Sequence, residues 1–339
     1  MSDATAESGE VPESGAPGAP DVSRSWPRRL ALGASVASLA AVLVPVTARL
    51  TGLEAGPLAY AVSFMPWVTL ACLVPLAFAA LARSRVLAVA TLVPFVACVA
   101  WLVPIYATSS VAGASEAELR VATINATLGR ADADAIVAMV KDRSIDVLAV
   151  EELTPAEAED LRVAGIDDAL PYSELAPQRG VEGTGLWSRL PMDSQEPVQG
   201  LTSHAVRATV AVGPENVAIY AVHPAAPGMF DHSRWAGDMK VLTGILEQND
   251  GPVIVAGDFN TTRDHRSFRD LEALGFRDAV DEAGAGFLPT FPNGRLPMPV
   301  VAIDHLIIRG STLAAVSAQT VVIPGADHRA LVVTYVRQD

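Results

Sequence analysis

Residues 253–260 of this chain of 339 residues read Val-Ile-Val-Ala-Gly-Asp-Phe-Asn, an apolar run that ends in polar side chains. Short runs rich in Val and Ile are typical of buried strands. Asp258 and Asn260 are two residues apart, so they point the same way on an extended backbone. Gly257 lets the backbone approach a ligand closely. Because ligands bind at strand ends in α/β sheets, the stretch predicts a functional site.

Similar runs recur along the C-terminal part of the chain, at residues 119–125, 145–150, 205–212, 216–222, 252–256, 300–308, 319–323 and 330–336. Amphipathic stretches with helical spacing lie between several of them, at Asp132–Lys141, Pro155–Val163 and His232–Gln248. The runs are mostly apolar on both faces, which indicates sheets that are covered on both sides. We therefore predict an α/β domain.

Polar side chains stand at the ends of other predicted strands too, at Asn125, Glu151, Glu152, His223, Asp304, Asp327 and His328. A carboxylate inside an apolar run, as at Asp304, needs a partner once it is buried. A histidine that must be oriented is a natural partner for it. Together these strand ends form a constellation that packing alone does not require.

These motifs resemble those of the endonuclease/exonuclease/phosphatase superfamily. The resemblance rests on Gly257-Asp258-Phe259-Asn260, Ile303-Asp304-His305 and Ala326-Asp327-His328-Arg329, with Asn125 and Glu152 upstream. It covers roughly residues 119–337 in the family's order. It implies a DNase I-like fold, which is a four-layer α/β sandwich of two packed mixed β-sheets flanked by helices.

The resemblance also implies metal-assisted attack of water on a phosphorus ester. Mg²⁺ or Mn²⁺ is the expected cofactor, because these ions prefer carboxylate oxygen. Glu152, Asn125 and Asp327 match the family's metal-side residues. Three departures, at Thr127, Glu151 and Ala326, leave metal affinity and the number of ions open.

The family's catalytic roles carry over to five further positions. Asp258 is expected to orient or deprotonate the attacking water, and Asn260 to position phosphate or nucleophile. His328 is expected to contact the phosphoryl oxygen. Asp304 is expected to hold His328 in orientation and raise its pKa. His223 is expected to face the phosphate as well.

Two positions, Thr290 and Arg329, are expected to bind substrate. Thr290, in Thr290-Phe291-Pro292, resembles a family loop near the substrate, although a plain turn is an equal alternative. Arg329 follows the expected catalytic histidine, His328.

The other histidines are not expected to take part in catalysis. His305 is expected to be structural. The remaining histidines are expected at the surface, namely His204, His232 and His265.

Three uncharged apolar stretches precede this domain, at about residues 30–48, 58–82 and 86–107. Each is near the ~20 residues that cross a bilayer, so we predict three transmembrane helices. The predicted organisation is a disordered tail (1–23), a membrane domain (24–107), a linker (108–118) and a catalytic domain (119–339). The alternative is a cleaved signal peptide before a soluble core.

The bases around these stretches predict their orientation. Arg24, Arg28 and Arg29 precede the first stretch, and Arg83 and Arg85 separate the second from the third. Cytoplasmic segments are enriched in such bases. We therefore predict a multi-pass protein of the cell membrane whose catalytic domain is extracytoplasmic.

Composition narrows the possible substrates and partners. The net charge of −14 falls entirely on residues 115–339, which excludes a protein built mainly to coat nucleic acid. Two cysteines exclude a disulfide scaffold. We expect a phosphodiesterase, first a nuclease. The alternatives are a phosphatase, a sphingomyelinase-like phospholipid-headgroup hydrolase, for which residues 224–230 offer a short apolar loop, and a weakly active binding domain.

Two partners are expected, namely the lipid bilayer, through the three spans, and a phosphodiester substrate, either nucleic acid or phospholipid. The sequence indicates no obligate protein partner, and we expect a monomer.

Overall fold

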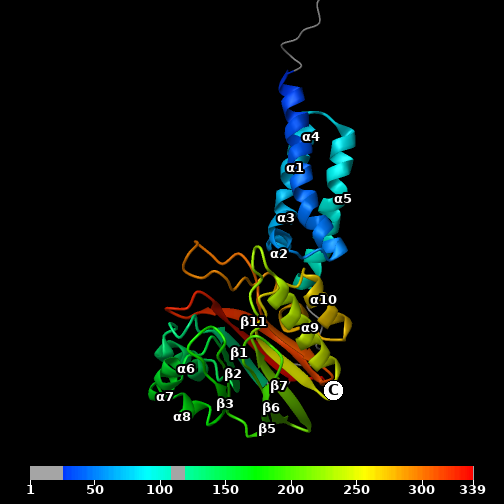
Figure 1. The fold of residues 1–339 in the computed structure, drawn as a ribbon. Helices are drawn as coiled ribbons and strands as arrows, with labels where there is room; N and C mark the ends of the chain where they lie inside the picture. The colour runs from blue at the N-terminus through cyan, green and yellow to red at the C-terminus, as the bar shows by residue number, and fades with distance from the viewer. Residues whose placement is uncertain (1–25, 108–118, 339) are drawn as a thin grey trace, which may run out of the picture.

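The structure is a computed structural model that describes residues 26–107 and 119–338. The predicted tail (1–23) and the predicted linker (108–118) lie outside these described residues. A bundle of apolar helices rises from one side of a two-sheet domain (Figure 1).

Two mixed six-stranded sheets form the centre of the C-terminal domain. The first has the order β11-β12-β1-β2-β4-β3, with bounds β1 (Leu119–Asn125), β2 (Val147–Glu151), β3 (Tyr172–Ala176), β4 (Thr184–Ser188), β11 (Leu313–Val322) and β12 (Arg329–Arg337). The second has the order β5-β6-β7-β8-β10-β9, with bounds β5 (Met192–Val198), β6 (Ala205–Val212), β7 (Glu215–Val222), β8 (Val253–Asp258), β9 (Arg277–Asp278) and β10 (Asp304–Arg309). In each sheet, one central pair is parallel (β1–β2 and β7–β8) and the others are antiparallel.

Helices cover the outer faces of both sheets, which completes four layers. The helices beside the first sheet are α6 (Ala133–Asp142), α7 (Pro155–Val163) and α8 (Ile166–Ala169), and those beside the second are α9 (Ser233–Glu247) and α10 (Arg266–Ala273). The short α11 (Ala279–Glu282) packs beside β10 and β11. Strand β1 shows why both faces are apolar, because Val121 packs between the sheets while Ile124 packs under the helices. The expected DNase I-like sandwich is confirmed.

Some strands differ from the predicted runs. Edge strand β5 has polar, exposed side chains, so it shows no apolar run in the sequence. Strand β11 begins earlier than the predicted run at 319–323 and carries an irregularity between Ala315 and Ser317. Apolar runs therefore locate central strands well and edge strands poorly.

The apolar N-terminal stretches form helices, but the middle one is broken. Helices α1 (Trp26–Thr51) and α5 (Arg85–Leu102), the latter extended by the 3₁₀ turn η2 (Val103–Tyr106), are long and apolar enough to cross a membrane. The middle stretch forms α2 (Pro57–Ser63), α3 (Met65–Ala71) and α4 (Leu73–Leu81), with a 74° bend after α2. Pro66 lies at this bend and lacks the N–H that a continuous helix needs. Among the described residues, two helices could span a membrane by length and composition, or three if the bent pair forms one span.

A mostly buried ion pair attaches α1 to the catalytic domain. The Nε atom of Arg49 lies 2.6 Å from Oδ1 of Asp264, which follows β8, and the two side chains are 11% and 6% exposed. The guanidinium of Arg49 also lies 3.9 Å from the ring centre of Trp101 in α5. Arg269 in α10 donates to the backbone carbonyl of Arg49 at 2.8 Å. The helical bundle and the catalytic domain are therefore one packed unit.

His265 corrects a prediction, because this side chain is fully buried and not at the surface. Its Nε2 lies 2.9 Å from the carbonyl of Ala59 in α2. Its Nδ1 accepts from the amide of Thr262 at 3.0 Å. Burial lowers the pKa of His265 to about 4, so the ring is neutral. The sequence did not show this, because the helix that buries His265 lies about 200 residues away.

We expect Arg49→Met to destabilise the full chain by about 3–5 kcal/mol, because it leaves Asp264 buried without its partner. The double variant Arg49→Met/Asp264→Leu should recover most of that loss. Chemical denaturation in nanodiscs measures both. The matched control is Arg162→Met, which breaks an exposed, solvent-screened pair with Glu159 and should cost far less. Equal costs for the two single variants would contradict the inference.

The neutral state of His265 predicts acid sensitivity. Its folded pKa, about 4, lies below the ordinary value of 6.5, so the unfolded chain binds this proton more readily. The stabilisation is present above pH 6.5 and is lost as the pH falls through about 4. Denaturation series between pH 7 and 4 should show this loss in the native chain and a flatter profile for His265→Gln. The exposed His204→Gln should leave the profile unchanged.

Candidate active site

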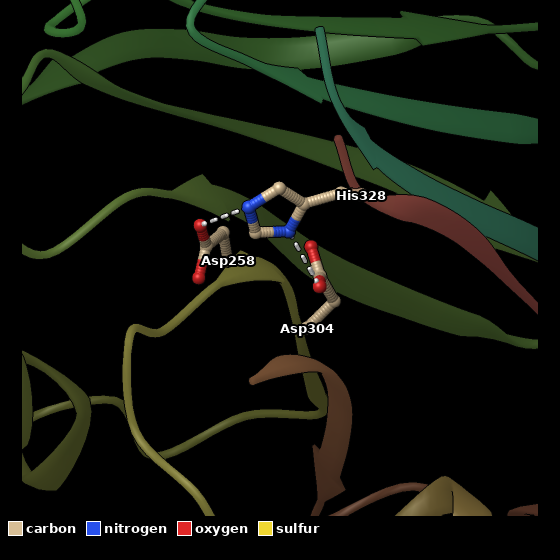
Figure 2. A group of neighbouring side chains, drawn as sticks. All are labelled: Asp258, Asp304 and His328. Carbon is tan, nitrogen blue, oxygen red and sulfur yellow. Dashed lines mark hydrogen bonds and ion pairs between the residues drawn. The ribbon is translucent and has the colours of Figure 1, made fainter. Parts of the chain in front are cut away.

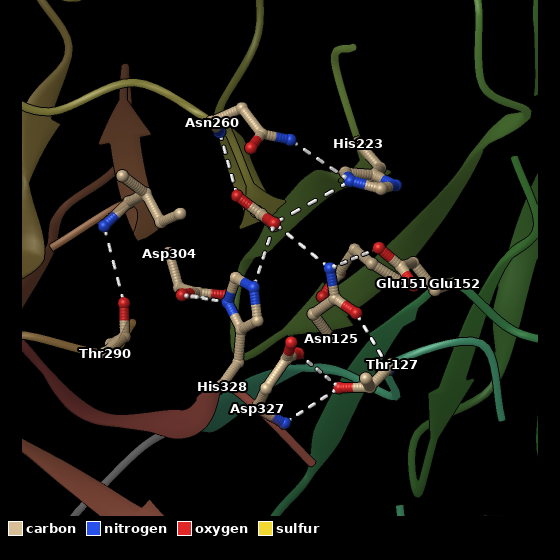
Figure 3. A network of polar contacts seen from close by, with 12 residues as sticks. Asn125, Thr127, Glu151, Glu152, His223, Asn260, Thr290, Asp304, Asp327 and His328 are labelled. Carbon is tan, nitrogen blue, oxygen red and sulfur yellow. Dashed lines mark hydrogen bonds and ion pairs between the residues drawn. The ribbon is translucent and has the colours of Figure 1, made fainter. Parts of the chain in front are cut away.

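The predicted site residues meet at one end of the sandwich, where strand ends from both sheets come together (Figure 3). Asn125 ends β1 in the first sheet, and Asp258 ends β8 in the second. Asp304 begins β10 directly opposite Asp258 in the antiparallel register. The side chains of all three are buried.

Asn125 is the centre of the polar network. Its Nδ2 donates to Oδ2 of Asp258 at 3.0 Å and to Oε1 of Glu152 at 3.2 Å. Its Oδ1 accepts from the backbone amide of Thr127 at 2.9 Å. Glu152 takes a left-handed backbone conformation, with φ of 52°, and also accepts from the amide of Leu128 at 2.8 Å. The amide and two carboxylates thus converge on one point.

His328 lies between two carboxylates (Figure 2). Its Nδ1 is 2.9 Å from Oδ2 of Asp304, and its Nε2 is 3.7 Å from Oδ2 of Asp258. One potential ligand atom from each of the three residues lies within 4.8 Å of the others. Burial alone would lower the pKa of His328, but the charges of Asp304 and Asp258 raise it to about 10. A protonated imidazole has no lone pair for a metal, so this group fits a hydrogen-bonded pair beside a base better than a metal centre.

Asp258 has the environment of a buried base. Burial raises its pKa, and the charge of Asp304 adds to the rise while His328 opposes it. Its Oδ1 accepts from the amide of Asn260 at 2.8 Å. A side chain at Gly257 would place Cβ 1.9 Å from the carbonyl oxygen of Val222, so only glycine fits before Asp258.

His223 and Asn260 form a second pair beside this base. Nδ1 of His223 lies 3.1 Å from the carbonyl oxygen of Val181, a hydrogen-bond acceptor, so Nδ1 carries the N–H that donates to it. Nε2 can then accept from Nδ2 of Asn260 at 3.2 Å, and it lies 3.7 Å from Asp258. The structure therefore brings both predicted phosphate-positioning residues next to the base.

Asp327 is held by two residues whose roles the sequence did not show. The hydroxyl of Thr127 donates to Oδ1 of Asp327 at 2.7 Å and accepts from its amide at 2.9 Å. Arg295 donates to Oδ2 at 3.0 Å. Thr127 stood out only as a departure from the family pattern, and Arg295 lies in a loop rich in Pro and Gly with no motif of its own.

Glu151 is a buried acid beside the site. It accepts from the hydroxyl of Thr123 on β1 at 2.9 and 3.0 Å. Burial, with the nearby charge of Asp304, raises its pKa well above the ordinary range. Its partner lies on the neighbouring strand, whereas Glu152 turns toward Asn125. Glu152 therefore faces Asn125 and Glu151 does not, and metal binding by Glu152 stays a prediction.

The two residues predicted to bind substrate lie against each other. The carbonyl of Thr290 accepts from the amide of Arg329 at 2.9 Å, and the buried Thr290 hydroxyl lies 3.4 Å from the amide of Ile303. Nε of Arg329 donates to Asn293 at 3.4 Å. Their contact with substrate stays a prediction. His305 pairs with Asp278 at 2.7 Å in the core, as expected for a structural histidine.

Comparison with known proteins identifies the family. A family model described as Endonuclease/Exonuclease/phosphatase family matches residues 121–328. The chain belongs to this family. Every predicted catalytic and metal-side residue falls within the matched range, which ends at His328.

A curated relative of this chain is distant in sequence. UPF0294 protein VP2298 of Vibrio parahaemolyticus is 23% identical over 172 residues, which cover 50% of this chain and 51% of that protein. The chain thus spans about half the length of this curated relative.

Solved structures show the same fold. Humanized D. rerio TDP2 has a TM-score of 0.54 at 16% identity, covering 64% of this chain and 98% of its own. D. rerio TDP2 complexed with single strand DNA product gives 0.53 at 16%, with the same coverage. A functionally unknown conserved protein from Enterococcus faecalis V583 gives 0.52 at 14%, covering 65% and 100%.

We expect Asp304→Asn to make His328 titrate at a lower pH, because the variant removes one of the two charges that hold the proton. NMR of the full chain with labelled histidine measures the midpoint, which we expect near pH 10 in the native chain. Asp278→Asn, which changes the environment of His305 instead, should leave the His328 midpoint in place. An unchanged midpoint in Asp304→Asn would show that Asp304 does not hold the ring.

Proposed function

We propose that this chain is a membrane-anchored, divalent-metal-dependent hydrolase of phosphoric esters, in which an activated water attacks phosphorus. The observation that carries the proposal is the buried set Asp258–His328–Asp304 beside the amide of Asn125. A base with a raised pKa and a protonated imidazole lie on one site, as acid–base hydrolysis requires.

Each residue of this set has a defined task. Asp258 takes a proton from water as the water oxygen bonds to phosphorus. The P–O bond to the leaving alcohol breaks, the alkoxide takes up a proton from solvent water, and Asp258 returns its proton to solvent. His328 donates a hydrogen bond to the phosphoryl oxygen as charge develops there. Asp304 holds the ring in place, and Asn260 and His223 position the phosphate.

A divalent cation fits the oxygen-rich side of the site. Glu152 and Asn125 are neighbours there, and Thr127 connects Asn125 to Asp327 through two hydrogen bonds. Carboxylate and amide oxygens are ligands that Mg²⁺ and Mn²⁺ prefer. When bound, such an ion would supply positive charge to the phosphoryl or leaving oxygen.

The membrane placement is part of the proposal. Arg28 donates to the carbonyl of Ala82 at 3.0 Å, so the N-terminal end of α1 lies beside the end of α4, near Arg83 and Arg85. This basic end is opposite to the catalytic domain (Figure 1). Basic ends favour the cytoplasm, so we place the catalytic domain outside it. We propose that the chain acts as a monomer in this membrane, without an obligate protein partner.

The substrate class has two main candidates. The sequence favours nuclease activity as the first candidate. The structurally similar D. rerio TDP2 was solved in complex with a single strand DNA product. A phospholipid-headgroup hydrolase is the alternative, because the spans keep the site near lipid. A phosphatase is a further alternative. A weakly active binding domain ranks lower, since the set of catalytic residues is complete.

The test uses the full chain in detergent with bis-p-nitrophenyl phosphate. We expect hydrolysis with Mg²⁺ or Mn²⁺ that EDTA abolishes and added metal restores. Asp258→Asn and His328→Gln should each lower kcat by about 10² to 10⁴-fold. The exposed Asp193→Asn is the matched control and should keep the native rate. Hydrolysis that persists in EDTA, or in both site variants, would contradict the proposal.

A further inference from the structure

Two loops beside the active site expose large apolar side chains. The first, residues 224–232, carries Met229 and Phe230, and the second, residues 291–300, carries Leu296 and Met298. Phe230 is 94% exposed, although removing such an apolar side chain from water is favourable. Clustered exposed apolar residues mark surfaces that contact something. We call these two segments the rim loops.

Both rim loops contact residues of the catalytic site. The first follows His223, and its Pro224 carbonyl accepts from Nδ2 of Asn260 at 3.0 Å. The second begins with Phe291, whose ring centre lies 4.7 Å from that of His328. It also contains Arg295, the partner of Asp327. A substrate that reaches the catalytic residues therefore meets the rim loops.

The same loops are bonded to the broken middle helices of the bundle. The hydroxyl of Tyr60 in α2 donates to the carbonyl of Pro227 at 2.5 Å. The indole N–H of Trp67 in α3 donates to the carbonyl of Val300 at 2.7 Å. Both loops lie on the side of the domain from which the helices rise (Figure 1, yellow-green and orange).

The length of α1 places these contacts at the membrane surface. Arg29 and Arg49 flank its apolar part and are 20 residues apart. At 1.5 Å per residue this is about 30 Å, which equals the thickness of the hydrocarbon core. Arg49 therefore marks the boundary beside the catalytic domain. Tyr60 and Trp67 are residue types that favour this interface.

We propose that the rim loops rest in the outer leaflet and that the site hydrolyses a phosphoester carried by a membrane lipid. This inference rests on the hydrolase function proposed above and names its substrate class. The bilayer is the occupant because the rim loops are hydrogen-bonded to α2 and α3 at the level where α1 would leave the membrane. Water oxygen bonds to phosphorus, and the bond from phosphorus to one esterifying alcohol breaks, which yields a phosphomonoester and that alcohol.

The net charge of the chain supports lipid over nucleic acid. A charge of −14 repels a polyanion, whereas a phosphodiester lipid brings a single negative charge that the bilayer already holds in place. Arg295, the positive charge on the second rim loop, is already paired with Asp327, so it offers little attraction to a nucleic-acid backbone. DNA cleavage is therefore the competing outcome of the test.

The test compares two reporters with the same leaving group. One is a diacylglycerol 4-methylumbelliferyl phosphodiester in phosphatidylcholine vesicles, and the other is methyl 4-methylumbelliferyl phosphodiester in water. The full chain is reconstituted in the vesicles with Mg²⁺ or Mn²⁺. We expect the lipid reporter to be hydrolysed at least about tenfold faster at equal total concentration. A single-stranded oligonucleotide is assayed in parallel.

Variants separate the rim loops from general effects. Met229→Asp/Phe230→Asp should lower the ratio of lipid to soluble rates by about tenfold, because charges oppose insertion. The matched control is Val163→Asp, which changes an exposed apolar residue of α7, remote from the helical bundle (Figure 1). That control should keep the native ratio.

A structural readout does not depend on turnover. A nitroxide on Phe230→Cys should be accessible to oxygen and shielded from a water-soluble nickel complex in vesicles, and one on Val163→Cys should show the reverse. The native Cys72 and Cys98 are buried and free.

The outcomes separate the two proposals. Cleavage of the oligonucleotide with no preference for the lipid reporter would overturn the lipid inference and leave the proposed hydrolase function standing. An equal loss on both reporters in the rim variant, or a water-exposed nitroxide at residue 230, would also overturn it. No hydrolysis of any reporter, in the native chain as in Asp258→Asn, would reject the hydrolase itself.

Discussion

The hydrogen bond from Asn125 to Asp258 joins the two sheets at the end of the sandwich that carries the site. A carboxylate buried there needs partners, and those partners come from different strands. The amide of Asn125 serves Glu152 as well as Asp258, and His328 bridges Asp258 and Asp304. The fold of the sandwich and the chemistry of the site therefore depend on the same contacts.

Much of this arrangement could be predicted from the sequence, because it depends on local patterns. Apolar runs on both faces predict covered sheets, and polar residues at the ends of those runs predict a shared edge. The motif around Asp258 needs only its neighbours, including a glycine that no other residue can replace without meeting Val222. The family model matches residues 121–328, which agrees with the family that the motifs predicted.

The sequence could not predict contacts between distant segments. His265 is buried only because α2 covers it, and Arg295 acts only because its loop folds back to Asp327. Edge strand β5 pairs through its backbone while its side chains remain polar and exposed, so no apolar run marks it. The bend before α3 is local, but the middle stretch contains two prolines, Pro66 and Pro75, so the sequence alone did not show at which of them the helix bends.

In the proposed membrane placement, the ion pair of Arg49 and Asp264 would also fix the height of the site above the bilayer, since α1 and the loop after β8 are held together by this pair. An enzyme held at constant height meets a bilayer-borne molecule by lateral diffusion in two dimensions. Its turnover then follows the mole fraction of that molecule in the leaflet. The same number of molecules spread over a larger membrane area is converted more slowly, even at an unchanged concentration per volume.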